Sequence, residues 1–289
     1  MKTRMGARTL TALGVTLLFW ASAFAGIRAG LEAYAPGHLA LFRFLVASAV
    51  LAVYAMLTRI RLPEKRDLPA ILLLGFLGIT VYHTALAYGE VSVTAGAASL
   101  LIAFAPMCTA LLAIIFLGER LRVWGWLGIA VSFLGVVLIA MGEGEGLQLD
   151  PGAFLILLAA LSTSLYFVFQ KRYLKKYSAL QFTTYTIWAG TFFLLVFSPG
   201  LAQAIRAAPL DATLAVVYLG VFPAALAYVT WAYVLSRAPA SIVASFLNLS
   251  PVLAILIAWV WLEELPVILS LTGGFLSLCG VILVNTRGR

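Results

Sequence analysis

The chain has 289 residues, of which 63% are hydrophobic and 10% are charged. Soluble domains carry about 25% charged residues, so this composition excludes a soluble globular protein and predicts an all-α integral membrane protein. The net charge of +8 does not indicate nucleic-acid binding, because the basic residues are spread over short loops. Cys108 and Cys279 lie in apolar runs, which favours neither a disulfide nor a metal site.

Ten apolar stretches of about 20 residues, the length that crosses a bilayer, follow one another along the chain. The predicted transmembrane helices are 9–28, 36–58, 68–88, 93–117, 123–141, 152–170, 179–198, 211–235, 240–262 and 266–285. The first has a basic start and ends in Ala23-Phe24-Ala25, a pattern that a cleaved signal peptide shares. We interpret it as a retained helix, because nine helices would leave one without a partner in the repeat described below.

The distribution of basic residues predicts the orientation. With the N-terminus in the cytoplasm, sixteen of the 19 Lys and Arg residues fall on the cytoplasmic side, all except Arg28, Arg43 and Arg206. Cytoplasmic loops carry such an excess of Lys and Arg. Both termini are therefore expected in the cytoplasm.

The chain matches itself at an offset of 145 residues. The coincidences pair Pro106 with Pro251 and Glu119 with Glu264. The offset carries the first predicted helix onto the sixth, and because five is odd the second copy enters the membrane from the opposite side. We therefore predict a 5+5 inverted repeat, with repeats at 1–145 and 146–289. Such repeats recur in secondary transporters, which place the substrate near the midplane between the copies.

Several motifs stand near the start of the first copy and at the end of each copy. They are Phe-Trp-Ala-Ser-Ala-Phe (19–24), Ala-Leu-Phe-Arg-Phe (40–44), Leu-Gly-Glu-Arg-Leu (117–121), Trp-Gly-Trp-Leu-Gly-Ile-Ala (124–130), Gly-Val-Val-Leu (135–138), Leu-Glu-Glu-Leu-Pro (262–266) and Gly-Val-Ile-Leu (280–283). Over nearly the whole chain, these segments resemble two EamA repeats of the drug/metabolite transporter superfamily. The second copy departs from the pattern, because Glu263 replaces a glycine and the seventh helix has no Arg-Phe pair.

The resemblance implies a secondary transporter of the bacterial inner membrane that exports small metabolites by alternating access. Amino acids, aromatic or other neutral ones, are the expected substrates, and the aromatic amino acid exporter type is the subgroup it resembles most. A channel or facilitator pore is one alternative, although no repeated filter of carbonyls or charges is visible. A membrane-embedded enzyme is the other, although neither Ser99 nor Cys108 has an obvious base partner. We expect no enzymatic activity and no cofactor, and only a small-molecule substrate and the lipid bilayer as partners.

Polar groups inside the membrane are costly and are therefore candidates for function. His83 can hydrogen-bond a substrate or be satisfied by a neighbouring helix, and both interpretations stay open. Aromatic residues of the helices that open each repeat, such as Phe169, can stack on a substrate or contact lipid. The predicted substrate-binding residues are Trp20, Phe24, Tyr82, His83, Ser99, Tyr166, Tyr228, Asn248 and Ser250. A nearly uncharged cavity of this kind suits a zwitterionic or weakly cationic molecule.

Helix-breaking residues occur in pairs that the repeat relates. Gly78 and Pro223 interrupt one pair of helices, and Pro106 and Pro251 interrupt another, so all four are predicted hinges, with kinking for packing as the alternative. Arg43 lies about 10 Å inside its helix, where it can attract a carboxylate or snorkel outward. No Asp or Glu stands in the middle of a predicted helix, which favours facilitated or exchange transport, with at most weak proton coupling through His83.

Overall fold

A computed structural model of the chain describes residues 6–105, 107–108, 112, 123–143, 150–237 and 246–287, and every regular element in these ranges is a helix. Six helical segments there are long and apolar enough to cross a membrane. They are Ala7–Leu31, Pro36–Thr58, Lys65–Gly89, Pro151–Gln170, Ala179–Phe197 and Leu210–Val234. Three shorter apolar helices accompany them at Val123–Ile139, Ser250–Leu262 and Ile268–Leu283.

Both halves of the chain are built from the same kinds of element. The first half contains α1 (Ala7–Leu31), α2 (Pro36–Thr58), the 3-10 turn η1 (Lys65–Asp67), α3 (Leu68–Gly75), the π-helix η2 (Phe76–Val81), α4 (Tyr82–Gly89), α5 (Ala95–Ile102) and α7 (Val123–Glu143). The second half contains α8 (Pro151–Tyr173), α9 (Ala179–Leu194), η3 (Leu195–Phe197), α10 (Leu201–Ala207), α11 (Leu210–Leu219), the π-helix η4 (Gly220–Leu226), α12 (Ala227–Arg237), η5 (Phe246–Leu249), α14 (Ser250–Leu262) and α15 (Ile268–Arg287). The short α10 was not predicted. Of the predicted helix 93–117 the structure describes α5 as a named element, and of the predicted helix 240–262 it describes η5 and α14.

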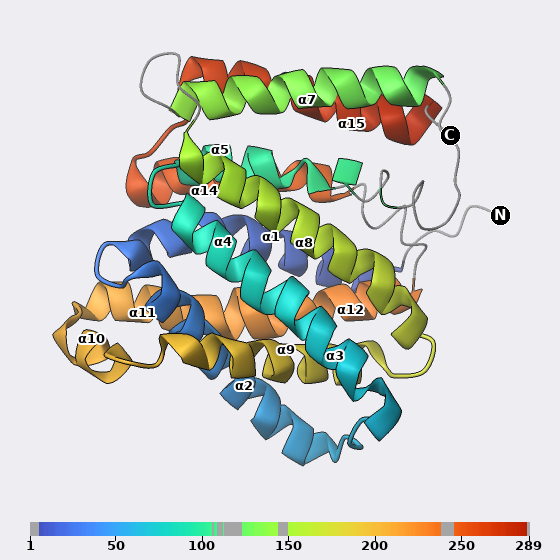
Figure 1. Ribbon diagram of the computed structural model, residues 1–289, viewed down its shortest axis with the longest axis vertical. Coiled ribbons are helices and arrows are strands. Elements are labelled where there is room, and N and C mark those ends of the chain that lie inside the picture. The colour runs from blue at the N-terminus through green and yellow to red at the C-terminus, as the bar shows by residue number, and fades with distance from the viewer. Residues whose placement is uncertain are drawn as a thin grey trace.

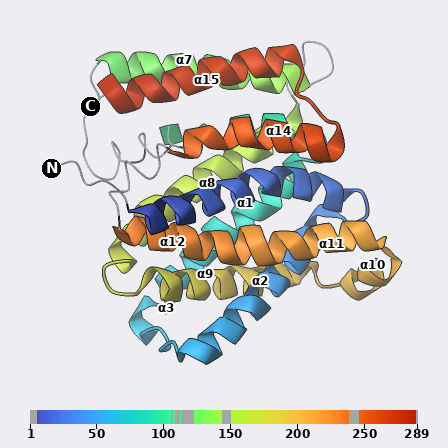
Figure 2. The same cartoon turned by 180° about the vertical axis from the view of Figure 1, so that it is seen from behind.

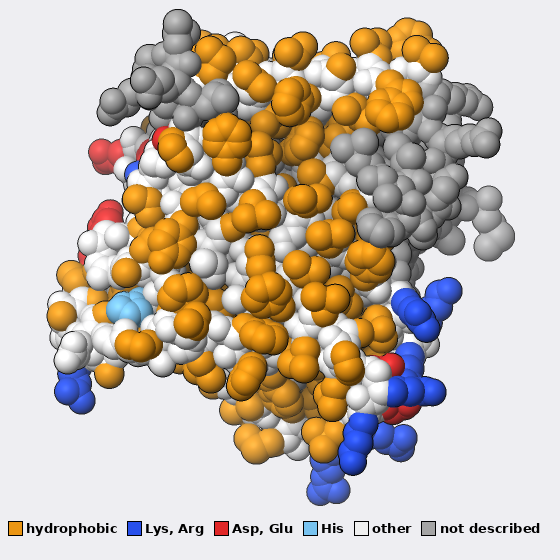
Figure 3. Space-filling model, in the orientation of Figure 1, with side chains coloured by type: hydrophobic (Ala, Val, Ile, Leu, Met, Phe, Trp, Pro, Cys, Tyr) orange, Lys and Arg blue, Asp and Glu red, His pale blue; other side chains and the backbone are white. Residues whose placement is uncertain are grey.

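The helices run between two opposite ends of the molecule (Figures 1 and 2). In both views α1 begins and α15 ends at the same end of the bundle. Hydrophobic side chains cover most of the face between the ends, and Lys and Arg gather mainly toward the end where α3 begins (Figure 3). An apolar surface of this extent is stable only in lipid. The chain is therefore a multi-pass membrane protein.

Polar residues at helix starts explain where several helices begin. Asp150 caps α8 by accepting a hydrogen bond from the backbone N–H of Gly152 at 2.6 Å. Ser178 caps α9 in a capping box with Gln181, in which each side chain accepts from the other residue's backbone N–H. These bonds satisfy backbone donors that the first turn of a helix leaves free.

Helices α7 and α15 form a close pair, visible at the top of Figure 1. A Cβ on Gly135 would stand 2.4 Å from the Gly273 carbonyl oxygen, and a Cβ on Gly280 would stand 2.5 Å from the Gly128 carbonyl oxygen. The offset of 145 residues converts each of these contacts into the other. At the centre of the pair, the hydroxyls of Ser132 and Ser277 lie 3.1 Å apart, although 145 residues separate them. Contacts between equivalent positions are what a twofold axis between two halves produces.

The two π-helices also occupy equivalent positions. Residues 76–81 of η2 correspond to 221–226 of η4 at the offset of 145. A π-turn is rare, widens a helix locally and is frequent at functional sites. Gly78 lies in η2 and Pro223 in η4, so the two predicted interruptions coincide with an observed irregularity of the helix.

Candidate functional site

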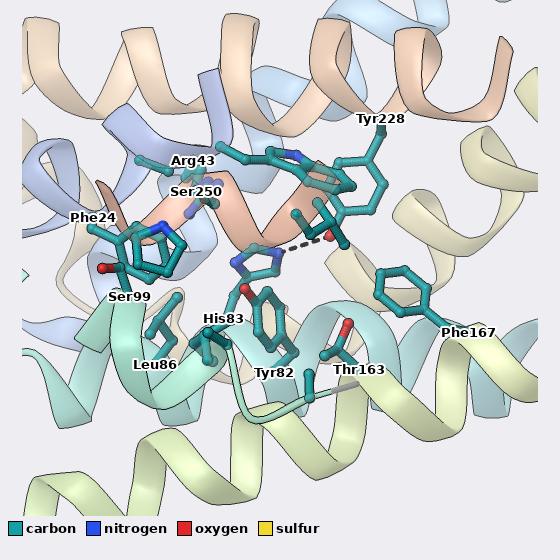
Figure 4. Close-up of a pocket in the computed structure, with 17 residues that line it drawn as sticks. Phe24, Arg43, Tyr82, His83, Leu86, Ser99, Thr163, Phe167, Tyr228 and Ser250 are labelled. Carbon is teal, nitrogen blue, oxygen red and sulfur yellow. Dashed lines mark hydrogen bonds between the residues drawn. The ribbon is translucent and has the colours of Figure 1, made fainter. Parts of the chain in front are cut away.

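A cavity of about 100 Å³ lies inside the bundle, between segments of the two halves. From the first half, its wall includes side chains of α1, α2, α4 and α5, and from the second half side chains of α8, α12 and α14. Figure 4 shows these side chains around the imidazole ring of His83. The volume is that of a small solute, below the range for drug-sized ligands. The wall is mostly apolar and aromatic, with a few polar groups.

His83 joins the two halves at the centre of the cavity. Its Nε2 lies 3.4 Å from the hydroxyl of Tyr228, which is 145 residues further along the chain and thus at the equivalent position of the second half. The imidazole also packs against Phe44 and Tyr82, with 4.5 Å between ring centroids in each case. Nδ1 of His83 is buried and has no hydrogen-bond partner. One ring nitrogen thus contacts a neighbouring helix and the other is unsatisfied, so a role of His83 in substrate binding stays a prediction.

Trp20 makes the second aromatic contact across the halves. Its indole Nε1 donates to the carbonyl of Pro223 in η4 at 3.2 Å. Its ring meets Tyr228 edge-on, at 5.4 Å between centroids. The hydrogen bond ties α1 to the irregular turn, so a movement of that turn would shift one wall of the cavity.

Arg43 is the charged residue of the cavity wall, and its side chain does not snorkel to the surface. The residue is 2% exposed, and among the residues that the structure describes it makes no ion pair and its buried Nε has no hydrogen-bond partner. Its guanidinium lies 5.5 Å from the ring centroid of Phe44. A buried guanidinium without a counter-ion is costly, and it therefore favours an anionic group nearby. The burial of Arg43 contradicts the interpretation in which it snorkels outward, and attraction of a carboxylate stays a prediction.

The cavity includes most of the predicted binding residues that the structure describes. Those on its wall are Trp20, Phe24, Tyr82, His83, Ser99, Tyr228 and Ser250, and the predicted hinge Pro251 joins them. The hydroxyl of Ser99 already donates to the Gly96 carbonyl oxygen at 2.6 Å. Pro106 and the side chain of Asn248 lie outside the described residues.

Tyr166 lies outside the cavity wall. Its ring packs on Gly78, where an added Cβ would come within 2.5 Å of Tyr166 Cγ, and its hydroxyl contacts Thr186 at 3.2 Å. Phe169 is 39% exposed, as lipid contact requires. The side chains of α8 that line the cavity are instead Thr163 and Phe167. Their spacing of four residues is the helical signal that would have separated this face from Tyr166.

A polar network lies at the end of the bundle where α1 ends. Arg28 Nη2 pairs with Glu264 Oε1 at 2.9 Å, and Arg28 Nη1 donates to the carbonyl oxygen of Glu90 at 2.7 Å. The second carboxylate oxygen of Glu264 accepts from the Ala95 backbone N–H at 3.1 Å, at the start of α5. Because Glu264 follows α14 and the other residues belong to the first half, the network joins the two halves at this end.

The ion pairs at the opposite end join the same halves. Lys176, in the loop after α8, pairs with Asp67 and, at 2.8 Å, with Glu64, both just before α3. The hydroxyl of Tyr177 also donates to Asp67 at 2.5 Å. We name the two ends after their basic residues, the Arg28 end and the Lys176 end.

No cluster of three His, Cys, Asp or Glu side chains that could hold a metal ion occurs in residues 6–105, 123–143, 150–237 or 246–287. Cys108 is buried and Cys279 is exposed, and both are free.

Comparison with known proteins identifies the family. Residues 9–141 and 150–286 each match the model of the EamA-like transporter family. The chain belongs to this family. The two matches also establish that the family's domain occurs twice, as the offset of 145 residues predicted.

Individual relatives agree with this assignment. The Bacillus subtilis protein YdfC, named an uncharacterized transporter, is 50% identical over 262 residues, which cover 91% of this chain and 86% of YdfC. A Streptantibioticus cattleyicolor protein named "Probable terminal-alkyne amino-acid exporter" is 41% identical over 281 residues, which cover 97% of this chain and 94% of that protein. One solved crystal structure covers 97% of both chains with a TM-score of 0.64 and 21% sequence identity, so it has the same fold. The EamA-like chain is thus a membrane transporter of small solutes.

Proposed function

We propose that this EamA-like transporter exports neutral amino acids or similar zwitterions across the bacterial inner membrane, through the cavity between its two halves. The observation that carries the proposal is the guanidinium of Arg43, buried in the cavity wall without a counter-ion. A substrate carboxylate supplies the missing counter-ion, and the aromatic rings around it suit an apolar side chain. The amino-acid exporter that is 41% identical to this chain supports the same substrate class.

The mechanism we propose is alternating access of two inverted repeats, 1–145 and 146–289, with five membrane-spanning helices each. Three observations support it: the His83–Tyr228 contact, the Ser132–Ser277 contact, and the equivalent places of η2 and η4. In an inverted pair, exchanging the conformations of the halves turns a cavity open to one side into one open to the other. The irregular turns η2 and η4, with Gly78 and Pro223, act as the hinges, together with Pro106 and Pro251.

The orientation we propose places the Lys176 end and both termini in the cytoplasm. Lys and Arg gather toward this end of the bundle, as Figure 3 shows, and they are the residues that cytoplasmic loops retain. The Arg28 end then faces outward. Labelling of single cysteines placed at Lys65 and at Arg206, with a reagent that does not cross membranes, tests this orientation; reaction of K65C in intact cells would contradict it.

Exchange of solute in liposomes tests the function. Liposomes that contain the purified protein and are loaded with an unlabelled neutral amino acid are expected to take up the labelled compound. They are expected to take up organic cations and phosphorylated sugars poorly. Arg43→Gln is expected to weaken apparent substrate affinity about tenfold or more, because it removes a charge-assisted hydrogen bond in a buried site. Arg206→Gln, at an exposed arginine of α10, is the matched control and is expected to transport normally.

Decarboxylated analogues sharpen this test. If Arg43 recognises the carboxylate, the wild-type protein binds the corresponding amines much more weakly than the amino acid. In Arg43→Gln this difference in affinity between the amine and the amino acid should disappear. Strong competition by the amines in the wild type, or strong preference for phosphorylated sugars, would refute the proposed substrate class.

A further inference from the structure

A carboxyl group lies buried and unpaired at the Arg28 end. Glu90 follows the last residue of α4 and is 0% exposed. Neither of its carboxyl oxygens has a hydrogen-bond partner. Tyr82, Leu86 and Glu90 are spaced by four residues and therefore lie on one face of α4. Tyr82 and Leu86 line the cavity, so Glu90 lies one turn beyond the cavity wall, toward the Arg28 end.

Two guanidinium groups act on Glu90 without pairing with its carboxyl. Arg28 of α1 uses one nitrogen for the backbone carbonyls of Glu90 and Val91 and the other for Glu264. Arg43 of α2 is near enough to interact electrostatically with Glu90, and no ion pair joins them. Glu264, after α14, adds a like charge.

The remaining ionisable groups around Glu90 are neutral or already satisfied. Tyr82, on the same helix, interacts with it electrostatically. Asp150, at the start of α8, accepts hydrogen bonds from Ser92 at 2.7 Å and from the Gly152 backbone at 2.6 Å. No neighbour therefore donates a hydrogen bond to the Glu90 carboxyl in this conformation.

An ionised carboxylate in such a place has lost its water and gained no donors, which strongly disfavours the charge. The neutral, protonated carboxyl is the form that this conformation accommodates. Opening of the Lys176 end lets cytoplasmic water reach Glu90 through the cavity, and the proton then passes from the carboxyl oxygen to that water, leaving a hydrated carboxylate. Opening of the Arg28 end lets this carboxylate take a proton from the outer solution, and closing that end again encloses the neutral carboxyl.

We propose that Glu90 is the proton-binding site that couples proton movement to solute movement. The inference rests on the proposed exporter function and goes beyond it by naming a driving ion. A proton binds Glu90 from the Arg28 end, is enclosed as the neutral carboxyl when that end closes, and passes to the cytoplasm when the Lys176 end opens, before the next substrate molecule binds. Inward movement of protons thereby drives outward movement of the substrate. The coupling resides in a carboxyl group rather than in His83.

Transport driven by a pH gradient tests the coupling. One coupled proton and a gradient of about one pH unit are expected to sustain a substrate concentration ratio of about tenfold in wild-type liposomes. Glu90→Gln, which is permanently neutral, is expected to lose this accumulation but to continue exchanging labelled for unlabelled substrate. Glu90→Asp retains a titratable group and is expected to restore part of the accumulation. Glu32→Gln, at an exposed carboxylate of the same end, is the matched control and is expected to accumulate normally.

The outcomes separate the two proposals. Accumulation by Glu90→Gln equal to wild type, or wild-type exchange that no pH gradient drives, overturns the role of Glu90 and leaves the exporter function standing. Absence of exchange with any amino acid overturns the exporter function. In that case infrared spectroscopy of the purified protein still decides the protonation of Glu90. A protonated-carboxyl band at neutral pH that Glu90→Gln loses and Glu32→Gln keeps supports the proposal, and its absence from the wild type overturns it.

Discussion

The two ends of the bundle hold its halves together by different physical means. At the Arg28 end, Arg28 and Glu264 are partly shielded, with side chains 30% and 17% exposed, and both also bind backbone groups. At the Lys176 end, Lys176 is 29% exposed and pairs through its side chain with Glu64, which is 51% exposed, and with Asp67, which is 13% exposed. Ion pairs exposed to solvent are weakened by salt and by side-chain entropy. The comparison indicates that the Arg28 end is the more firmly closed in this conformation.

Helix packing agrees with this difference. At the Arg28 end, α1, α5 and α14 pack on one another, and Gly96 of α5 approaches Pro266 so closely that an added Cβ would lie 2.4 Å from it. These contacts close the cavity on that side. A transporter that alternates must break them together with the Arg28 network, whereas the Lys176 pairs can exchange with water.

Removal of Arg28 is expected to have the largest effect. Arg28→Ala leaves Glu264 without its ion pair and the Glu90 carbonyl without its donor, and a charge-assisted hydrogen bond contributes about 1.5–3 kcal/mol. The Arg28 end should therefore open about tenfold more often. The measurement is the rate at which a membrane-impermeant thiol reagent labels F24C in the cavity wall, with Cys108 and Cys279 replaced by alanine. An unchanged rate would show that helix packing alone closes this end, and Arg206→Ala is the control.

Removal of Lys176 is expected to have a smaller effect on access from its own end. Lys176→Ala breaks the pairs with Glu64 and Asp67, and because Glu64 is half exposed and the side chain of Lys176 binds no backbone group of the described residues the labelling rate should rise by no more than about fivefold. High salt should reproduce the effect in the wild type and should barely alter the Arg28 end. A larger rise in labelling rate than Arg28→Ala produces would show that the Lys176 end is the more firmly closed of the two. Lys175→Ala, at the preceding exposed lysine, is the control.

Acid provides the mildest perturbation of the Lys176 end. The hydrogen bond from Lys176 lowers the pKa of Glu64, and the charge of Arg66 lowers it further. A carboxyl whose pKa is lowered on folding contributes stability above its unfolded pKa and loses that contribution as the pH falls through its folded pKa. The melting temperatures of wild type and Glu64→Gln should therefore differ by a constant amount above about pH 5 and converge at lower pH. A difference that persists in strong acid would assign the effect to packing, and Glu32→Gln should show no such trend.

Much of the architecture could be predicted from the sequence. Apolar runs of membrane length located the helices, because in lipid a single segment can satisfy its backbone hydrogen bonds by itself only as a helix. Most of the predicted binding residues line the cavity, since polar and aromatic residues such as His83 and Tyr228 are conspicuous in apolar helices. The face that each helix turns inward was harder to predict. Helices that are apolar on all sides give a weak periodic signal, so Tyr166 was selected where Thr163 and Phe167 line the cavity.

The sequence by itself determined the membrane class, the family likeness and the repetition at an offset of 145 residues, because these depend on composition and on linear spacing. Only the tertiary structure decided that Arg43 and Glu90 are buried without ion-pair partners. The reason is that burial of a side chain near a helix end depends on the neighbouring helices, and these come from distant parts of the chain. Glu90 stands at the end of its predicted helix, where a carboxylate ordinarily meets water, and the packing of α2 and α8 against α4 removes that water.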